Sequence, residues 1–593
     1  MASLAIVFVL VGTFAAWAAD PPASAPPGSL DSRVAAELSR LKALLAAQQK
    51  QFEEQQQQME QLRQALDLAR QQFETISASM NATPSDAPPC ATGAVDCAQN
   101  TAPHVPRLTE GPLPGRPRRP LMASADPALT PPPLSLPAAL PSYSPPPTPP
   151  QTGEAPVAPH IRIGDAYFTP IGFVDFTTVI RSAATGSGIG TNFGAIPYNN
   201  VPTARLTDFL PNLQNSRIGV RIDTKVHGWR VIGYWESDFL GQAPGNLEVT
   251  SNSNTFRLRL FWVDVRKNHW EFLGGQSWSL LTPNRVDISP LPSNIFYTLV
   301  EDVNYVIGLT WGRTPQFRVV YHASEKFGAA ISLEEPQQYI GGSGGQGSIT
   351  FPTNSNIATN YANQLNNGNT TLSVPNVAPD VIGKLSFDTN TGKRKLHQHI
   401  ELVGLYRQFR VWNPANNRYF RSAGGGGSLN MNFEVLPGLH LIANTFASDG
   451  GGRWLFGSGP DLIILGNGAI SPIHAYSTLD GVEYTRHNTQ LFTYYGAAYF
   501  TRNTAIDLNG VLVGYGYHGS PNTQNRTVQE GTGGIIQTFW KDPKYGALLF
   551  IVQPAYFFRN PWYVIPGQPR NAHNFSVFLS LRYNFPGLEP SLR

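Results

Sequence analysis

Charged side chains recur at every second position in several apolar segments of this 593-residue chain. Within residues 217–223, Arg217, Arg221 and Asp223 alternate with isoleucine and valine. Arginines that face a confined aqueous space would concentrate anions and bind carboxylates through paired hydrogen bonds. The same arginines could instead pair with neighbouring acids and brace a protein wall, and the sequence leaves both roles open. The candidate set is Arg217, Arg221, Arg230, Arg257, Arg259, Arg318, Glu236 and Asp238.

Other residues that could do chemistry form no complete site. His397, His399 and Glu401 alternate along one segment as some metal ligands do, but no second segment supplies the remaining ligands. Glycine-rich stretches at 341–348 and 423–428 do not join a strand to a helix, so they do not fit a phosphate loop. No nucleophile motif such as G-x-S-x-G is present. We therefore predict no enzyme, no metal and no cofactor.

Composition narrows the class of protein further. Only 14% of residues are charged and the net charge is +3, which gives no support to nucleic-acid binding. Mean hydropathy is −0.20, which excludes a helical membrane protein. The one long apolar run, residues 4–19, has the length of a signal-peptide core and small residues near its end. We expect residues 1–18 to be a signal peptide, with an uncleaved anchor as the alternative.

The next two segments should not form a globular core. Residues 30–80 repeat apolar positions at alternating spacings of three and four, a heptad pattern that predicts a coiled coil. The alternative is a disordered glutamine-rich tract. Residues 81–160 hold 22 of the 51 prolines and predict an extended linker. Cys90 and Cys97 lie in this linker, where export would permit a small local disulfide.

Residues 161–593 predict a transmembrane β-barrel. One face of each amphipathic segment carries Phe, Trp, Leu, Ile and Val, while the other carries charged, polar and small residues. Sixteen such segments occur, at 168–180, 217–226, 229–239, 256–267, 270–278, 314–323, 327–334, 380–388, 396–411, 427–436, 439–447, 475–486, 489–502, 531–541, 546–558 and 573–585. Short turns alternate with long loops between them, as in antiparallel outer-membrane barrels.

Three points leave alternatives or exceptions to this barrel prediction. A soluble sandwich or propeller would need a second apolar layer over each sheet, and it would not explain one uniformly aromatic face. The segment 259–265 breaks the alternation, so the strand count is uncertain by two. The long loop at 277–313 could fold into the barrel and narrow it, or could lie on the outer surface.

Several motifs resemble those of the DcaP-like trimeric porins of Gram-negative outer membranes. They are QNSRIGVRI at 214–222, GYWESDFLG at 233–241, RLRLFWVDV at 257–265, LGGQSWSLL at 273–281 and RTPQFRVVY at 313–321. Tyr583-Asn584-Phe585 resembles the C-terminal signal for barrel assembly, although eight residues follow it. The resemblance implies a homotrimer of sixteen-stranded barrels, with a periplasmic coiled coil, that passes small and often anionic solutes such as dicarboxylates. By position, Arg217, Arg257, Arg259 and Glu236 match charged residues of those motifs.

The combined prediction is an all-β outer-membrane porin, surrounded by lipid, with a passive water-filled channel for small hydrophilic solutes and some preference for anions. The N-terminal segment is expected in the periplasm. A different function remains open, in which the barrel is mainly an anchor and the coiled coil binds the peptidoglycan of the cell wall.

Overall fold

The computed structural model describes residues 160–241, 254–295, 297–342, 347–353, 356–368, 374–376, 378–392 and 395–586. The predicted signal peptide, coiled coil, linker and cysteine pair lie outside these ranges. The chain divides into two units, Met1–Arg119 and Pro120–Arg593, and the barrel belongs to the second. No helix in the described ranges is long and apolar enough to cross a membrane.

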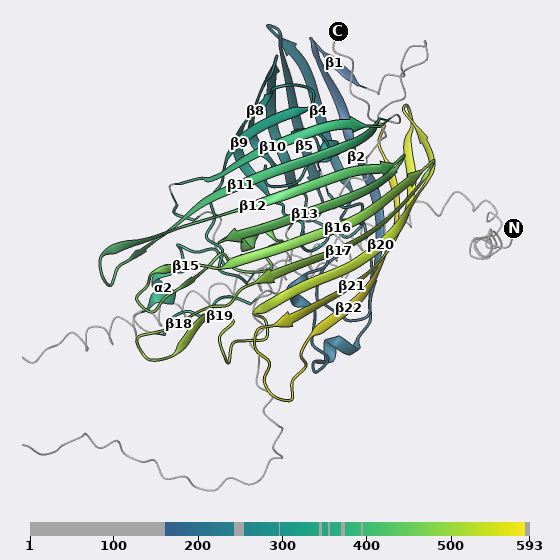
Figure 1. Ribbon diagram of the computed structural model, residues 1–593. Coiled ribbons are helices and arrows are strands. Elements are labelled where there is room, and N and C mark those ends of the chain that lie inside the picture. The colour runs from purple at the N-terminus through teal and green to yellow at the C-terminus, as the bar shows by residue number, and fades with distance from the viewer. Residues whose placement is uncertain are drawn as a thin grey trace, which may run out of the picture. The chain divides into compact units, whose positions relative to one another are not determined.

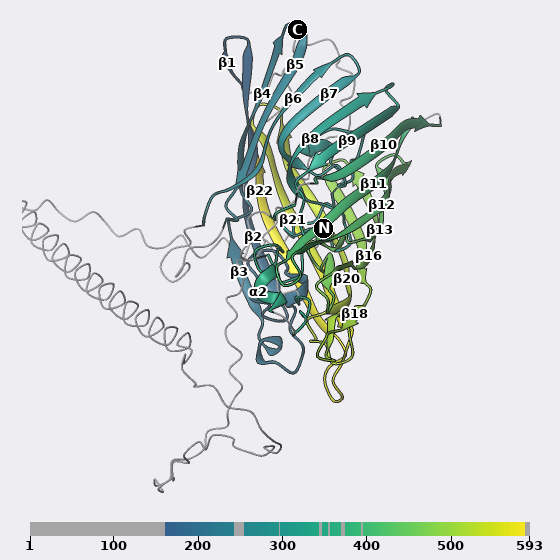
Figure 2. The same ribbon diagram turned by 90° about the vertical axis from the view of Figure 1, so that its left-hand side faces the viewer.

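Sixteen long antiparallel strands form the barrel (Figures 1 and 2). They are β2 (Ala166–Arg181), β4 (Arg217–Val226), β5 (Trp229–Asp238), β6 (Arg257–Lys267), β7 (Trp270–Trp278), β8 (Arg313–His322), β9 (Phe327–Glu334), β10 (Asp380–Thr391), β11 (Leu396–Asn413), β12 (Arg418–Leu436), β13 (Leu439–Asp449), β16 (His474–Arg486), β17 (Thr489–Phe500), β20 (Asn525–Asp542), β21 (Gly546–Pro561) and β22 (Ala572–Asn584). Two further strands of the same sheet, β1 (Ile161–Ile163) and β3 (Asp208–Asn212), are short and pair with β2.

Pairing of the first and last long strands closes the barrel. β2 pairs with β22 from Phe173↔Asn584 to Arg181↔Ser576, and its other edge pairs with β4 and β3. Closure removes the unpaired sheet edges that lipid would not tolerate. Each of the sixteen predicted segments coincides with one of these strands, and the predicted sixteen-stranded barrel is confirmed.

Burial follows the predicted alternation. On β22, Phe575 and Leu581 are 46% and 47% exposed, whereas Ser576, Ser580 and Arg582 are buried. Phe578, which breaks the pattern in the sequence, points inward and is fully buried. Between Phe575 and Arg582 the outward positions of this strand are therefore apolar, as a lipid-facing wall requires, and the inward positions are polar except for Phe578.

A β-bulge explains the irregular segment of β6. The register with β5 shifts between Glu236 and Ser237, which pair with Leu260 and Leu258 and leave Arg259 as the extra residue. A bulge sets one additional residue into one strand of an antiparallel pair. Arg259 and Leu260 are consecutive and both fully buried, so the inward-facing side switches from odd to even residues at this point.

The two kinds of connection differ as predicted. The two-residue turn between β4 and β5 has positive φ at His227 (49°) and Gly228 (80°), the geometry of a tight hairpin turn. Most connections at the opposite end are long and carry small elements: α2 (Ile357–Tyr361), β14 (Leu462–Ile464), β15 (Ile470–Pro472), β18 (Asn503–Ile506) and β19 (Leu512–Tyr515).

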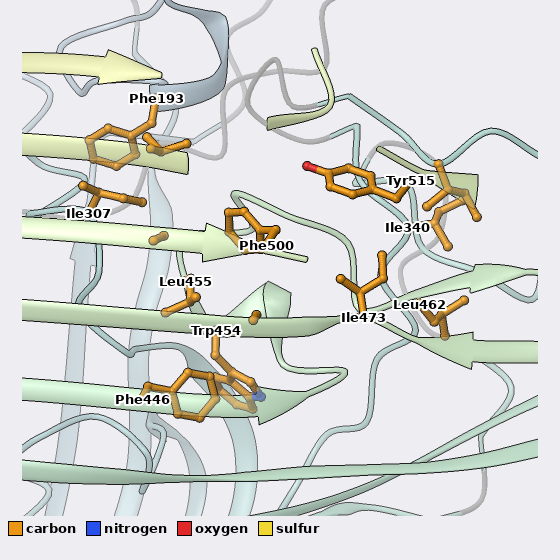
Figure 3. Packing of buried hydrophobic residues seen from close by; sticks show 14 of the residues in the cluster. Phe193, Ile307, Ile340, Phe446, Trp454, Leu455, Leu462, Ile473, Phe500 and Tyr515 are labelled. Carbon is orange, nitrogen blue, oxygen red and sulfur yellow. The ribbon is translucent and has the colours of Figure 1, made fainter. Parts of the chain in front are cut away.

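The interior is less uniformly polar than the sequence suggested. Inward-facing Phe446, Phe500 and Phe557 pack with apolar residues of the long loops in one buried cluster, part of which Figure 3 shows. Trp454, Leu462 and Tyr515 are among the loop residues of this cluster. The long loops therefore form an apolar core of their own against the wall, which strand alternation alone does not predict.

Candidate functional site

The barrel interior is crossed by the connection between β7 and β8, called here the inward loop (residues 279–312). Among its described residues, Leu280, Leu299, Tyr305 and Ile307 are almost completely buried. The sequence left open whether this loop lies inside the barrel or on its outer surface. The structure places it inside.

Inward-facing side chains of the wall bind the backbone of the inward loop. Buried N–H groups need acceptors, and side chains from several strands supply them. The carboxylate or amide oxygens of Glu401, Gln553, Glu530 and Asn444 accept hydrogen bonds from the N–H groups of Asn284, Glu301, Ile307 and Thr310, respectively. These acceptors lie on β11, β21, β20 and β13, so the loop is attached around much of the interior.

One buried ion pair fixes the first part of the loop. The Nη1 and Nη2 atoms of Arg285 each lie 2.9 Å from one carboxylate oxygen of Glu483 on β16. Tyr494 on β17 donates a further hydrogen bond of 2.8 Å to Glu483. Both charged side chains are about 5% exposed. Two parallel hydrogen bonds between a guanidinium and a carboxylate fix orientation as well as distance.

A second cluster fixes the far part of the loop to the closing strands. Arg582 Nη2 lies 2.6 Å and 2.8 Å from the two carboxylate oxygens of Glu301. Its Nε donates to Asp175 on β2 at 2.6 Å. Thr177 and Asn215 also donate to Glu301, at 2.9 Å and 2.7 Å. The inward loop is therefore attached at the barrel seam as well as at β16.

Three arginines of the predicted selectivity set surround its two acids, Glu236 and Asp238. Arg259 binds Glu236 through Nε and Asp238 through Nη1, the latter at 3.1 Å. Arg257 forms a bidentate pair with Asp238 at 3.0 Å and 2.8 Å. Arg217 Nη1 lies 3.7 Å from Glu236. The bulge at Arg259 makes this possible, because it brings Arg257 and Arg259 to the same acid.

The remaining three predicted residues lie apart from that cluster. Arg221 and Arg230 both contact Asp223, at 2.7 Å and 3.3 Å. Arg318 contacts Gln316 and the carbonyl oxygen of Trp278 instead of an acid. The side chains of Arg230 and Arg257 are 36% and 21% exposed, and the other arginines of the set are almost completely buried. Each arginine of the set therefore makes bracing contacts, and the side chains of Arg230 and Arg257 are the two that are partly exposed.

The sequence analysis did not identify the residues that attach the inward loop to the barrel wall. Asp175, Glu483 and Arg582 occupy inward positions of their strands, so alternation could have placed them in the interior. Arg285 and Glu301 lie in a segment without periodicity, and nothing in the sequence pairs them with particular wall residues.

The histidine segment forms hydrogen bonds with neighbouring side chains of the barrel wall. His397 and His399 contact the same carboxylate oxygen of Asp388, at 3.0 Å and 2.9 Å. Glu401 lies 3.0 Å from Lys384 Nζ. In the described ranges, no three or more His, Cys, Asp or Glu side chains are arranged to hold a metal ion.

Comparison with known proteins gives a structural match without a match in sequence searches. No protein-family model and no curated protein matches the chain. The outer membrane channel DcaP of Acinetobacter baumannii superposes with a TM-score of 0.52 and 17% identity, covering 72% of this chain and 100% of that one. The anion-selective porin from Comamonas acidovorans superposes with a TM-score of 0.38 and 12% identity, and the match covers 71% of this chain and 100% of that one. The chain therefore has the fold of the DcaP channel, and the predicted resemblance is confirmed at the level of fold.

Proposed function

We propose that this protein is an outer-membrane porin of the DcaP-like family, which forms a passive, water-filled channel for small hydrophilic solutes. The closed sixteen-stranded barrel, with its apolar outer face and charged inner face, carries the proposal. Barrels of about this size enclose an interior wide enough for an aqueous path. The inward loop occupies part of that interior, so we propose that it sets the width of the path.

We also propose a preference for anions such as carboxylates. Support comes from Arg230 and Arg257, whose side chains remain partly exposed although both contact acids. An exposed guanidinium can exchange its acid partner for a solute carboxylate with similar bidentate geometry. The buried members Arg217 and Arg259 would act by setting the local potential and by holding Glu236 and Asp238 in place.

Single-channel recording of the purified full-length protein in planar bilayers tests the proposal. We expect stepwise conductance and, under a salt gradient, a reversal potential that favours anions. Replacing Arg217, Arg257 and Arg259 with glutamine should move that potential toward the cation side. Absence of conductance from folded protein would refute the channel, and an unchanged reversal potential would refute the role of these arginines.

Assembly and location form part of the proposal. The motifs shared with trimeric porins support a homotrimer in the outer membrane with a periplasmic N-terminal segment. The heptads of residues 30–80 favour a second role, in which the coiled coil contacts the cell wall. Light scattering of the detergent-solubilised protein tests the trimer, and co-sedimentation with purified peptidoglycan tests the contact.

A further inference from the structure

The β11–β12 hairpin extends beyond both neighbouring strands. β10 pairs with β11 only as far as Tyr406, and β13 pairs with β12 only as far as Gly425. Figure 1 shows the end of this hairpin reaching past the adjacent strands. Its last residues therefore present an outer surface at the end of the barrel that carries the long loops.

Alternation along β11 locates this surface relative to the apolar belt. Leu402 and Tyr406 face outward and are 60% and 48% exposed. Arg410 lies on the same face, four residues farther on, about 13 Å along a strand that rises roughly 3.3 Å per residue. Beyond it, the rings of Trp412 and Tyr419 lie 4.6 Å apart. Aromatic residues of this kind gather in the interfacial region at the level of the lipid headgroups, and Arg410 and Arg421 lie next to this aromatic pair in the same region.

Two arginines face each other on this outer surface. Arg410 is directly opposite Arg421 in the β11–β12 register. Like charges in this position repel each other. Arg410 Nη2 donates to the Pro375 carbonyl oxygen at 3.3 Å, and its guanidinium lies 5.3 Å from the Tyr419 ring. Within the described ranges neither arginine has an ion pair with an acid, unlike Arg257, Arg259 and Arg285 inside the barrel.

A strip of small residues lies next to the two arginines, on the side away from the tip of the hairpin. Ala423, Gly425 and Gly427 follow each other on the outer face of β12, and Gly427 pairs with Gly404 of β11. A Cβ atom at Gly404 would meet no atom within 4 Å, and one at Gly427 would meet only a backbone oxygen at 3.4 Å. Local packing therefore does not require glycine at these two positions. Leu402 and Leu429 lie at the end of the strip farthest from the two arginines, and both are exposed.

We propose that this surface binds a phosphorylated acyl lipid of the outer leaflet, of the lipid A type. A lipid phosphate lies between Arg410 and Arg421 and neutralises their repulsion. One acyl chain lies along Ala423, Gly425 and Gly427, and the sugar contacts the pair of aromatic rings. The inference depends on the proposed outer-membrane location but not on conduction, since it uses only the outer face.

Native mass spectrometry of the full-length protein in detergent, titrated with bisphosphorylated lipid A, tests the inference. We expect R410Q/R421Q to bind at least about tenfold more weakly, since each 1.4 kcal/mol lost is a factor of ten. K267Q/R486Q is the matched control, because it removes two exposed charges at the short-turn end and should bind like the wild type. Gly404→Leu should also weaken binding, because it fills the strip while keeping both arginines.

Ligand controls identify the chemistry. Lipid A without phosphates should bind the wild type as weakly as bisphosphorylated lipid A binds R410Q/R421Q, and millimolar inorganic phosphate should compete poorly because it lacks acyl chains. Equal binding by wild type and R410Q/R421Q, or by phosphorylated and dephosphorylated lipid, would overturn the inference. Conductance of the same preparation separates the two claims: a conducting protein without phosphate-dependent lipid binding contradicts this inference alone.

Discussion

Removing the guanidinium of Arg285 should release the first part of the inward loop. In Arg285→Gln, Glu483 loses both 2.9 Å contacts and stays buried, while the hydrogen bond from Tyr494 remains. Breaking one partner of a buried ion pair costs about 3–5 kcal/mol. That cost changes the ratio of attached to detached loop by roughly 150- to 5,000-fold.

Single-channel recording in planar bilayers measures the effect. If the inward loop bounds the solute path, R285Q should show higher mean conductance and increased open-channel noise. In the double variant R285Q/E483Q, conductance and open-channel noise should return much of the way to wild-type values, because this variant also removes the uncompensated buried charge. R486Q is the matched control, since Arg486 is an exposed arginine on the same strand as Glu483, beside the turn.

Wild-type conductance and noise in folded R285Q would refute this reasoning. So would equal effects of R285Q and R486Q, because a general loss of positive charge would then explain the change. A larger effect in the double variant than in the single one would show that the uncompensated charge of Glu483 is not what releases the loop.

Three further predictions concern selectivity, the long loops and the N-terminal segment. R257Q should shift the reversal potential more than R318Q does, because the Arg257 side chain is partly exposed whereas Arg318 is buried. A hydrogen bond from Thr353 lowers the pKa of Asp507 from its ordinary value of 3.8 to about 2. The contact between Asp507 and Thr353 should therefore persist above pH 4 and be lost as the pH falls toward 2. Cleavage by pepsin of the loop that contains Asp507 should therefore rise more steeply from pH 4 to pH 2 in the wild type than in D507N, since the pH dependence of pepsin itself is common to both. At pH 7, proteinase K should cut D507N faster than the wild type. Deleting residues 30–80 should leave single-channel conductance unchanged and abolish co-sedimentation with peptidoglycan; retained co-sedimentation would rule out the coiled coil as the contact.

The strands and their faces were predictable because a half-buried strand repeats every two residues. The one irregular segment of β6 follows from the same rule once the bulge at Arg259 is known. Short turns were predictable too, because residues such as Gly228 and Gly438 interrupt the pattern between adjacent strands.

The interior was predictable only in part. Alternation placed Glu236 and Asp238 inside together with their arginines, and it left open whether these residues brace the wall or act on solutes. It did not place the inward loop, since Arg285 and Glu301 find partners about 200 and 280 residues away in sequence. The apolar contacts of Phe446 and Phe500 with the long loops were missed for the same reason: they depend on loop folding and not on strand period.

The outer face can be tested most directly by spin labels placed one at a time along β22, in a background in which Cys90 and Cys97 are serine. In liposomes, the account predicts that labels at Phe575, Val577, Leu579 and Leu581 collide readily with oxygen dissolved in the lipid. Labels at Ser576 and Ser580 should be shielded from it. Loss of this two-residue period, or a folded protein that stays in solution without detergent, would contradict the account.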